Sequence, residues 1–268
     1  MRKLRLSLGL GSRSAGAGVF SPALLFAAGE QGYWLDPSDF STMFQNAAGT
    51  TPVTAVGQSV RRILDKSGRG NHFTQANVAN APILQVDGTG RYFLLFDGSD
   101  DWLQSAATIN PGSVDKVQVF AGLRKLSDAG GSGAFVEVSA NFSANNGSFA
   151  FFAPQTAAPN YFFNSNGTTQ RNAAAPAASP VTSVVTGLAD ISAPNVIIRL
   201  DGAQAASNTA TQGTGNYLTY THFIGRRGGT TLPFNGRLYQ LITRYGANLT
   251  ADQIAATETF VNQRTGAY

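Results

Sequence analysis

The chain has 268 residues, of which 43% are hydrophobic and 13% charged, and its 30 glycines and 11 prolines are typical of a turn-rich all-β protein with one core. It contains no cysteine, which excludes disulfide bonds and thiol-ligated metals, and with only His72 and His222 a multi-histidine metal site is nearly excluded. The net charge of +4 is modest and unevenly distributed along the chain.

Residues 1–32 are predicted to form an arm ahead of one domain, residues 33–268. The apolar run of residues 6–11 is too short and too glycine-broken for a secretory signal, and no later stretch approaches the ~18 apolar residues of a membrane span. The arm holds one acid, Glu30, and four basic residues, Arg2, Lys3, Arg5 and Arg13. The domain is therefore near neutral, and no nucleic-acid-binding face is expected. The arm is expected to add no strand to the core and to be either a tail without fixed structure or a tether to another protein.

A short helix is expected at the start of the domain. Asp36 suits the N-cap, Pro37 the first helical position and Asp39 the first turn, which favours a helix to about Gln45.

From residue 60 onward the hydrophobic period changes to two, which indicates strands. Val117, Val119 and Leu123 alternate with less apolar neighbours and predict a strand with one face in the core. Glycine, asparagine and aspartate turns separate the other candidates, which are residues 60–64, 72–75, 82–86, 92–96, 101–104, 135–139, 148–153, 161–164, 181–187, 195–201 and 220–225. About a dozen strands suit two packed antiparallel sheets.

Two segments do not show this pattern. Residues 173–180 are alanine-rich and interrupted by prolines, and residues 203–216 are rich in alanine, threonine and glycine. Both are predicted to be exposed loops that contact a neighbouring subunit of a homo-oligomer.

The C-terminal region predicts a strand, residues 234–242, followed by one helix. Thr250 suits the N-cap with Gln253 three residues on, Leu249 suits a hydrophobic staple, and Gly266 ends the helix. A single helix after so many strands predicts an all-β, two-sheet antiparallel sandwich sealed by a C-terminal helix.

Three motifs carry a resemblance to a known family. They are D-x-S-G-x-G-N-H at residues 65–72, F-D-G-x-D-D-x-L at residues 96–103, and F-x-G-x-L-Y at residues 234–239. In this order the set resembles the laminin-G-like branch of the concanavalin A-like lectin/glucanase superfamily, over about residues 33–268. The resemblance implies a concanavalin A-like jelly roll and says much less about activity.

The arm together with residues 29–39 and 56–72 looks like a family of laminin-G-like proteins of tailed bacteriophages and prophages. This resemblance implies a virion component that is assembled in the host cytoplasm and belongs to the tail or a tail fibre. The arm would bind other virion proteins, and the sandwich would face host cell-surface glycan. A capsid decoration or head-fibre protein and a bacterial carbohydrate-binding or degrading protein are the alternatives.

Catalysis is not expected. Glycoside hydrolysis needs two carboxylates, and glucanases of this superfamily place theirs on alternate residues of one strand. Here Glu137 has only Ser139 in the neighbouring same-face position. Glu137 is expected to be a solvated or hydrogen-bonded strand residue whose replacement by Gln changes stability little. Neither a Gly-x-Ser-x-Gly elbow nor a phosphate loop occurs.

Two sets of residues are candidates for binding. Aromatic rings beside amides suit sugars, which points to Tyr161, Phe162, Asn164, Tyr217 and Tyr220, although core or subunit packing explains such rings as well. Carboxylates on a turn suit Ca²⁺, and turn chemistry explains them equally well; the candidates are Asp97, Asp100 and Asp101. No other cofactor is expected. His72 and His222 are expected to be hydrogen-bonded residues at strand ends.

Overall fold

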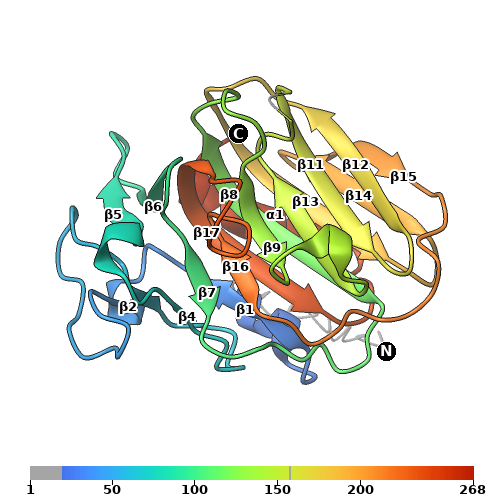
Figure 1. Cartoon of the computed structure of the whole chain (residues 1–268), viewed down its shortest axis with the longest axis horizontal. Helices are drawn as coiled ribbons and strands as arrows, with labels where there is room; N and C mark the ends of the chain where they lie inside the picture. The colour runs from blue at the N-terminus through green and yellow to red at the C-terminus, as the bar shows by residue number, and fades with distance from the viewer. Residues whose placement is uncertain (1–19, 157) are drawn as a thin grey trace, which may run out of the picture.

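Two antiparallel sheets packed face to face make up the protein, and one helix lies behind them (Figure 1). The computed structural model describes residues 20–156 and 158–268. Within these residues, sheet A has eight strands. Seven of them follow the spatial order β15 (Ala203–Asn208), β14 (Asn195–Leu200), β13 (Val181–Asp190), β8 (Lys116–Lys125), β17 (Asn235–Tyr245), β6 (Tyr92–Asp97) and β5 (Ile83–Val86). The eighth, β1 (Gln31–Leu35), pairs with β17. The predicted fold class, an all-β antiparallel sandwich with a C-terminal helix, is confirmed.

Sheet B has nine strands among the described residues, several of them short. Their spatial order is β12 (Gln170–Pro176), β11 (Asn160–Asn166), β10 (Ser148–Phe152), β9 (Ala134–Val138), β16 (His222–Ile224), β7 (Leu103–Ser105), β4 (Phe73–Thr74), β3 (Arg62–Ile63) and β2 (Met43–Phe44). Outside the strands, the described residues form four short 3₁₀ helices, η1 (Pro22–Phe26), η2 (Phe40–Thr42), η3 (Val78–Asn80) and η4 (Phe142–Ala144).

The core fills the space between the sheets. In β8 the alternating residues Val117, Val119 and Leu123 are fully buried there, as their period of two predicts. From sheet B, Phe149 and Phe151 meet them, so each sheet contributes its apolar face to a single cluster.

Helix α1 (Ala251–Thr265) covers the outer face of sheet A. Its capping box is formed as predicted, because Thr250 Oγ1 accepts from the Gln253 N–H at 3.2 Å while Gln253 Oε1 accepts from the Thr250 N–H at 2.9 Å. Leu249 packs in the same cluster as Ile254, which fits the predicted staple, and Gly266 ends the helix at a φ of 65°. The helix contacts β8, β13 and β17.

The N-terminal region is more closely attached than the sequence predicts. Leu25 and Phe26 of η1 are buried beside α1, and β1 begins at Gln31, which pairs with Tyr245 at the end of β17. The expectation that the predicted arm adds no strand is wrong, since its last two residues start β1. Residues 1–19 of the arm lie outside the described residues, and the division into an arm and a domain stays a prediction.

The expectation of a helix from Asp36 to about Gln45 is also wrong. The structure has the three-residue η2 with Asp39 as its N-cap, followed directly by β2. The Asp36 carboxylate accepts from both the backbone and the hydroxyl of Ser38, which holds the chain in a turn instead of a helix.

Both predicted alanine-rich loops contain strands. Residues 173–176 belong to β12, where Ala173 and Ala175 lie opposite Phe163 and Tyr161 of β11. Residues 203–208 form β15. Alanine is poor in β propensity, but a small side chain fits beside large aromatic neighbours, so packing decides the structure here. Across the described residues, no helix has the length and apolar character needed to cross a bilayer.

Candidate functional site

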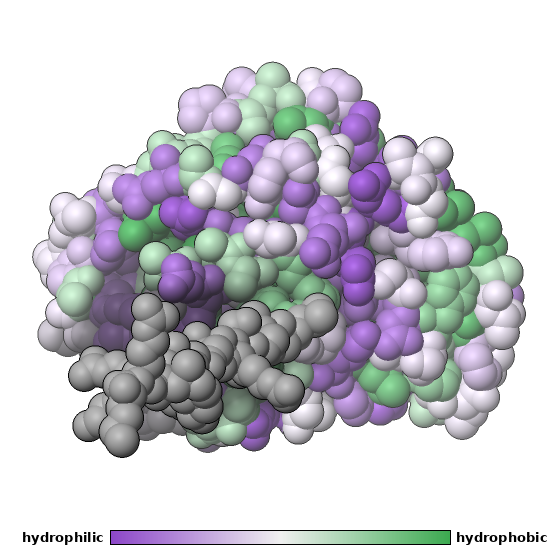
Figure 2. All heavy atoms as spheres, turned by 180° about the vertical axis from the view of Figure 1, so that it is seen from behind, coloured by the Kyte–Doolittle hydropathy of each residue, from purple (hydrophilic) through white to green (hydrophobic). Residues whose placement is uncertain are grey.

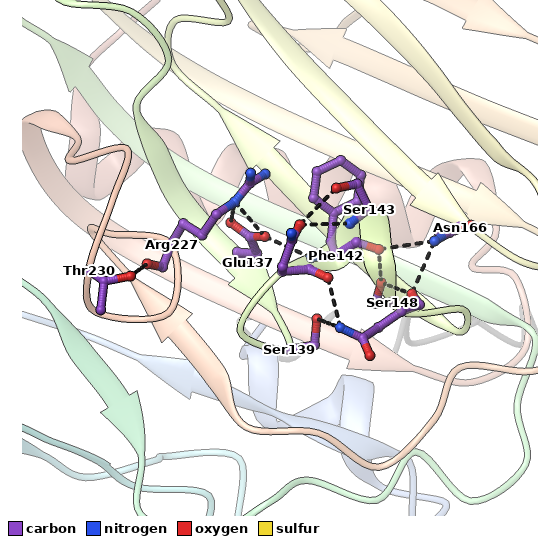
Figure 3. A network of polar contacts seen from close by, with 10 residues as sticks. Glu137, Ser139, Phe142, Ser143, Ser148, Asn166, Arg227 and Thr230 are labelled. Atoms are coloured by element: carbon purple, nitrogen blue, oxygen red, sulfur yellow. Dashed lines mark hydrogen bonds and ion pairs between the residues drawn. The ribbon is translucent and has the colours of Figure 1, made fainter.

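Glu137 lies at the centre of the outer face of sheet B and is closed off from solvent. Its side chain is 0% exposed, both carboxylate oxygens accept from Arg227 Nε at 3.0 Å, and Oε1 accepts from the Phe142 N–H at 2.9 Å (Figure 3). Burial raises the pKa of Glu137, and the Phe142 N–H and the Arg227 charge act against that rise. The carboxylate is hydrogen-bonded, one of the two forms expected, and it joins two loops to the sheet.

The loop over Glu137 is fixed from its other side as well. The Phe142 carbonyl accepts from Ser148 Oγ at 2.9 Å and from Asn166 Nδ2 at 3.0 Å (Figure 3). The Phe142 ring packs against Phe152, with 5.8 Å between the ring centroids. This loop therefore covers the middle of sheet B and leaves no open cleft above Glu137.

Three of the predicted sugar-binding residues are buried. Tyr161 and Tyr217 are 0% and 1% exposed and belong to the core between the sheets. Tyr217 Oη lies 2.6 Å from Ser165 Oγ, and Asn164, 1% exposed, accepts from Gln170. Because all three side chains are at most 1% exposed, they do not reach a ligand at the surface.

The other two predicted residues reach the surface at different places. Phe162 is half-buried in the outer cluster of Phe142 and Phe152. Tyr220, also half-buried, donates from its hydroxyl to the Asn146 carbonyl at 2.9 Å. The structure does not bring the five predicted residues together into one site.

A cavity of about 410 Å³ opens elsewhere on the same outer face. We call it the amide groove; its polar and aromatic lining consists of Thr74, Gln75, Asn77, Asn80, Trp102 and Gln104. Strand register explains how it forms, because Gln104 of β7 lies opposite Thr74 of β4 on one side and Phe223 of β16 on the other. Phe223 lies opposite Glu137, so the groove continues the row of outward-facing residues that starts there.

Trp102 gives the groove an aromatic wall. Its ring lies 6.1 Å from that of Phe223, and its backbone N–H donates to the Asn80 carbonyl at 3.0 Å. Gly229 approaches the indole so closely that a Cβ there would lie 2.7 Å from Cζ2, at a φ of 69° that favours glycine. The half-buried indole is thus held in place before any ligand arrives.

Hydrogen bonds also fix the amides. Gln75 Nε2 donates to the Trp102 carbonyl at 2.9 Å, Asn77 Nδ2 donates to Asn80 Oδ1 at 2.6 Å, and Asn80 Nδ2 donates to Asp100 Oδ2 at 2.8 Å. An aromatic plane beside oriented amides can cover the apolar face of a sugar and hydrogen-bond its hydroxyls. The sequence signal was present in Trp102 and Gln104, two residues apart in the predicted strand 101–104, but the pairing of β4 with β7 could not be inferred from it.

The acidic residues proposed for Ca²⁺ do come together, and Asp100 is hydrogen-bonded to Asn80 of the groove. One carboxylate oxygen from each of Asp97, Asp100 and Asp101 lies within 4.8 Å of the others. Burial, with the nearby charges of Asp97 and Asp100, raises the pKa of Asp101 to about 7, although the Asp97 N–H donates to it. Three hard oxygen ligands suit Ca²⁺. The hydrogen bond from the Ser99 N–H to Asp97 Oδ1, however, is what an ordinary turn makes without a metal. Calcium binding stays a prediction.

The two histidines have hydrogen-bonding roles, as expected. His72 Nδ1 accepts from the Asp65 N–H at 3.0 Å. His222 is fully buried between two tyrosines, with Nδ1 3.4 Å from Tyr33 Oη and Nε2 3.2 Å from Tyr245 Oη.

No protein-family model and no curated protein matches this sequence. Solved structures do match. One is a structure of botulinum neurotoxin type C, whose cell entry depends on interaction with two ganglioside molecules, with a TM-score of 0.55 and 11% identity over 87% of this chain and 51% of that one. Another is the receptor binding domain of botulinum neurotoxin D, with a TM-score of 0.56 and 10% identity over 86% of this chain and 52% of that one.

A third is the ligand binding domain of botulinum neurotoxin serotype D in complex with N-acetylneuraminic acid, with a TM-score of 0.53 and 12% identity over 74% of this chain and 48% of that one. The chain spans about half the length of these structures. Likeness at this identity shows the fold alone. The chain has the lectin-like jelly-roll sandwich that these binding domains share.

Proposed function

We propose that this protein is a non-enzymatic, lectin-like binding module that takes a sugar of a cell-surface glycan in the amide groove. The observation that carries the proposal is the held Trp102 indole beside Gln104 and the hydrogen-bonded amides, in a cavity of about 410 Å³. Such a lining is mostly preformed, which lowers the entropic cost of binding. The solved domains of the same fold, named for receptor or ligand binding, agree with a binding role.

The state of Glu137 favours binding over hydrolysis. A general acid has to reach the glycosidic oxygen at hydrogen-bonding distance. The Glu137 carboxylate is instead buried, paired with Arg227 and covered by the loop at Phe142. Incubating the purified protein with host surface polysaccharide should release no oligosaccharide detectable by mass analysis, and released fragments would identify an enzyme.

The biological setting that we propose is the virion of a tailed phage, in the tail or a tail fibre. Support comes only from the sequence resemblance of the arm and of residues 29–39 and 56–72. Capsid decoration and a bacterial carbohydrate-binding protein remain the alternatives. Labelling this protein by antibody on purified particles distinguishes tail from head, and absence from particles points to the bacterial alternative.

The groove itself is tested with neutral oligosaccharides on a glycan array, followed by calorimetry on the best ligand. Trp102→Ala should weaken binding by about 30-fold or more, the effect of losing a central aromatic anchor. Because Trp102 also packs on Phe223, Gln104→Ala provides a second variant with a smaller structural effect. Phe162→Ala, which removes an aromatic ring outside the groove, is the matched control. Loss of binding in the control alone would move the site to the outer cluster.

A further inference from the structure

A second cavity, on the outer face of sheet A, gathers three arginines. Arg91 precedes β6, Arg124 lies on β8 and Arg237 on β17, and together they line a space of about 230 Å³ beside the C-terminal end of α1. This is the helix-covered face of the sandwich, opposite to the amide groove. Seen from behind, that side of the molecule shows a band of hydrophilic residues across its middle (Figure 2).

The strand register forces two of these charges together. Arg237 and Arg124 are directly opposite each other in adjacent antiparallel strands, on the same face of the sheet. Like charges in this position destabilise a sheet. The next residue in the row is Thr182 of β13, whose Oγ1 accepts from Arg124 Nη1 at 2.9 Å and brings no negative charge.

Only some of the partly buried arginines of this protein have acidic partners. Arg199 pairs with Glu258 at 2.7 Å, and Arg244 pairs with Glu30 at 2.8 Å. Over residues 20–156 and 158–268, by contrast, no ion pair joins any of the three cavity arginines to a carboxylate.

One acid, Asp87, does lie in the cavity wall, but its oxygens have other donors. Oδ1 accepts from the backbone and hydroxyl of Thr89 and from the Arg91 N–H, and Oδ2 accepts from Tyr239 Oη at 3.2 Å. The end of α1 adds only the partial negative charge of its last carbonyls. Three full positive charges thus face one carboxylate and a helix terminus, which leaves the cavity positive.

The arginines are also held in place. The Arg237 guanidinium lies 4.6 Å from the centre of the Phe93 ring, and Arg91 lies against Gly266 and donates to Thr89 Oγ1. A planar guanidinium held by stacking presents its remaining N–H groups in a fixed direction, which is the geometry that binds an oxyanion through two parallel hydrogen bonds.

We propose that this cavity, bordered by Arg91, Arg124 and Arg237, binds an oxyanion: a phosphate, a sulfate or a carboxylate, free or as the charged group of a larger ligand. The anion supplies the negative charge that Arg124 and Arg237 lack and cancels their repulsion across the strands. This site does not depend on the amide groove, which lies on the other sheet and contains no arginine in its lining.

The test uses inorganic phosphate at pH 7 with the whole protein. Melting temperatures are measured along a phosphate series, with KCl of equal ionic strength as the reference, and affinity by calorimetry. Phosphate should raise the melting temperature in a saturable way that KCl does not reproduce. Arg124→Gln and Arg237→Gln should each weaken phosphate binding about tenfold or more, since each removes a charged donor.

Arg171→Gln, which removes an arginine on β12 far from this cavity, is the control and should bind like the wild type. Without phosphate, Arg124→Gln should melt no lower than the wild type, because it relieves a repulsion, whereas an arginine with a purely structural role would lower the melting temperature when removed. Equal phosphate effects in the wild type and both cavity variants, or no saturable effect in the wild type, would overturn the proposal.

A second series distinguishes the sources of the anion. Glucose 6-phosphate is compared with inorganic phosphate, and glucuronate with acetate. Tighter binding of glucose 6-phosphate or glucuronate than of the matching simple ion assigns the cavity to a charged glycan, and equal binding assigns it to a free ion. In either case Arg124→Gln and Arg237→Gln should weaken the binding. Failure of neutral sugars to bind would count against the amide groove and leave this cavity unaffected.

Discussion

Glu137 shows how burial changes what a single acid does. The sequence leads one to expect that Glu137→Gln would change stability little, but the carboxylate is fully buried and bonded to Arg227 and to the Phe142 N–H. We now predict that Glu137→Gln lowers the free energy of unfolding by about 1.5–3 kcal/mol, the value of hydrogen bonds to a charged group. Chemical denaturation measures it.

Arg227→Gln and the double variant complete that experiment. If the pair is the source of the effect, the double variant should lose clearly less stability than the sum of the two single variants. Additive losses would mean that Glu137 and Arg227 act separately.

The shifted pKa values of His222 and Asp101 predict opposite pH dependences of the free energy of unfolding. Burial lowers the pKa of His222 to about 3 from about 6.5 in an unfolded chain. The unfolded state therefore binds more protons between these values, and the contribution of His222 to stability rises with pH by up to about 1.4 kcal/mol per pH unit. The pKa of Asp101 is raised to about 7, so its contribution is present at low pH and is lost as pH rises through 7.

Urea unfolding between about pH 4.5 and 6.5 separates these contributions. Relative to the wild type, His222→Gln should lose stability as pH rises, and Asp101→Asn should gain it. Comparison with the wild type cancels the contribution of the other carboxylates. Identical profiles for all three proteins would show that neither group has the assigned pKa.

The candidate site was only partly predictable at this scale. The sequence shows that Tyr161, Phe162 and Tyr217 are aromatic, but which face of a strand a ring takes depends on bulges and on neighbouring strands; two of these rings are buried. The acidic cluster was predictable because its members lie within five residues. The amide groove was not, since it needs residues 74–80 beside residues 102–104, a pairing set by the sheet.

Helix α1 depends on a glycine in the strand beneath it. A Cβ at Gly122 of β8 would collide with Thr265 Oγ1 and lie 3.3 Å from Val261 Cγ1. Gly122→Ala should therefore push the helix from the sheet and lower stability by about 1–3 kcal/mol, as overpacking does. Thr250→Ala should cost about 0.5–2 kcal/mol through loss of the N-cap hydrogen bond.

Melting curves and amide exchange measure both effects. Gly122→Ala should speed exchange along the whole helix, while Thr250→Ala should affect its first turn. Gly88→Ala, where a new Cβ has open space, is the control. Wild-type exchange in Gly122→Ala would mean that the sheet adjusts without moving the helix.

Elements with strong local signals were the predictable ones. The capping box at Thr250 and the alternation of apolar residues in β8 are each contained in a short stretch of sequence. Helix α1 and strand β8 could therefore be predicted from it. Strand β12 could not be recognised, because Ala173 and Ala175 carry no β preference of their own and become strand residues by packing beside Phe163 and Tyr161. The two-residue strand β2 was missed as well, since it forms by pairing with β3 in sheet B.

At the scale of the whole molecule, η1 and the start of β1 pack against the sandwich. Deleting residues 1–32 removes the buried Leu25 and Phe26 and the Glu30 partner of Arg244. We predict that the truncated protein keeps a β-type circular dichroism spectrum but melts lower by about 10 °C or more. A truncation that melts like the wild type would show that η1 contributes little to stability.

The position of η1 also decides which way the protein faces. Phe20 packs on Phe260 of α1, so the chain enters the fold on the outer side of sheet A, whereas the amide groove opens on the outer side of sheet B. A copy fastened through its N-terminus would point its groove outward, away from the surface that holds it. An array of such copies would then present many weak sites to one cell, and the high local concentration would make the attachment far stronger than any single contact.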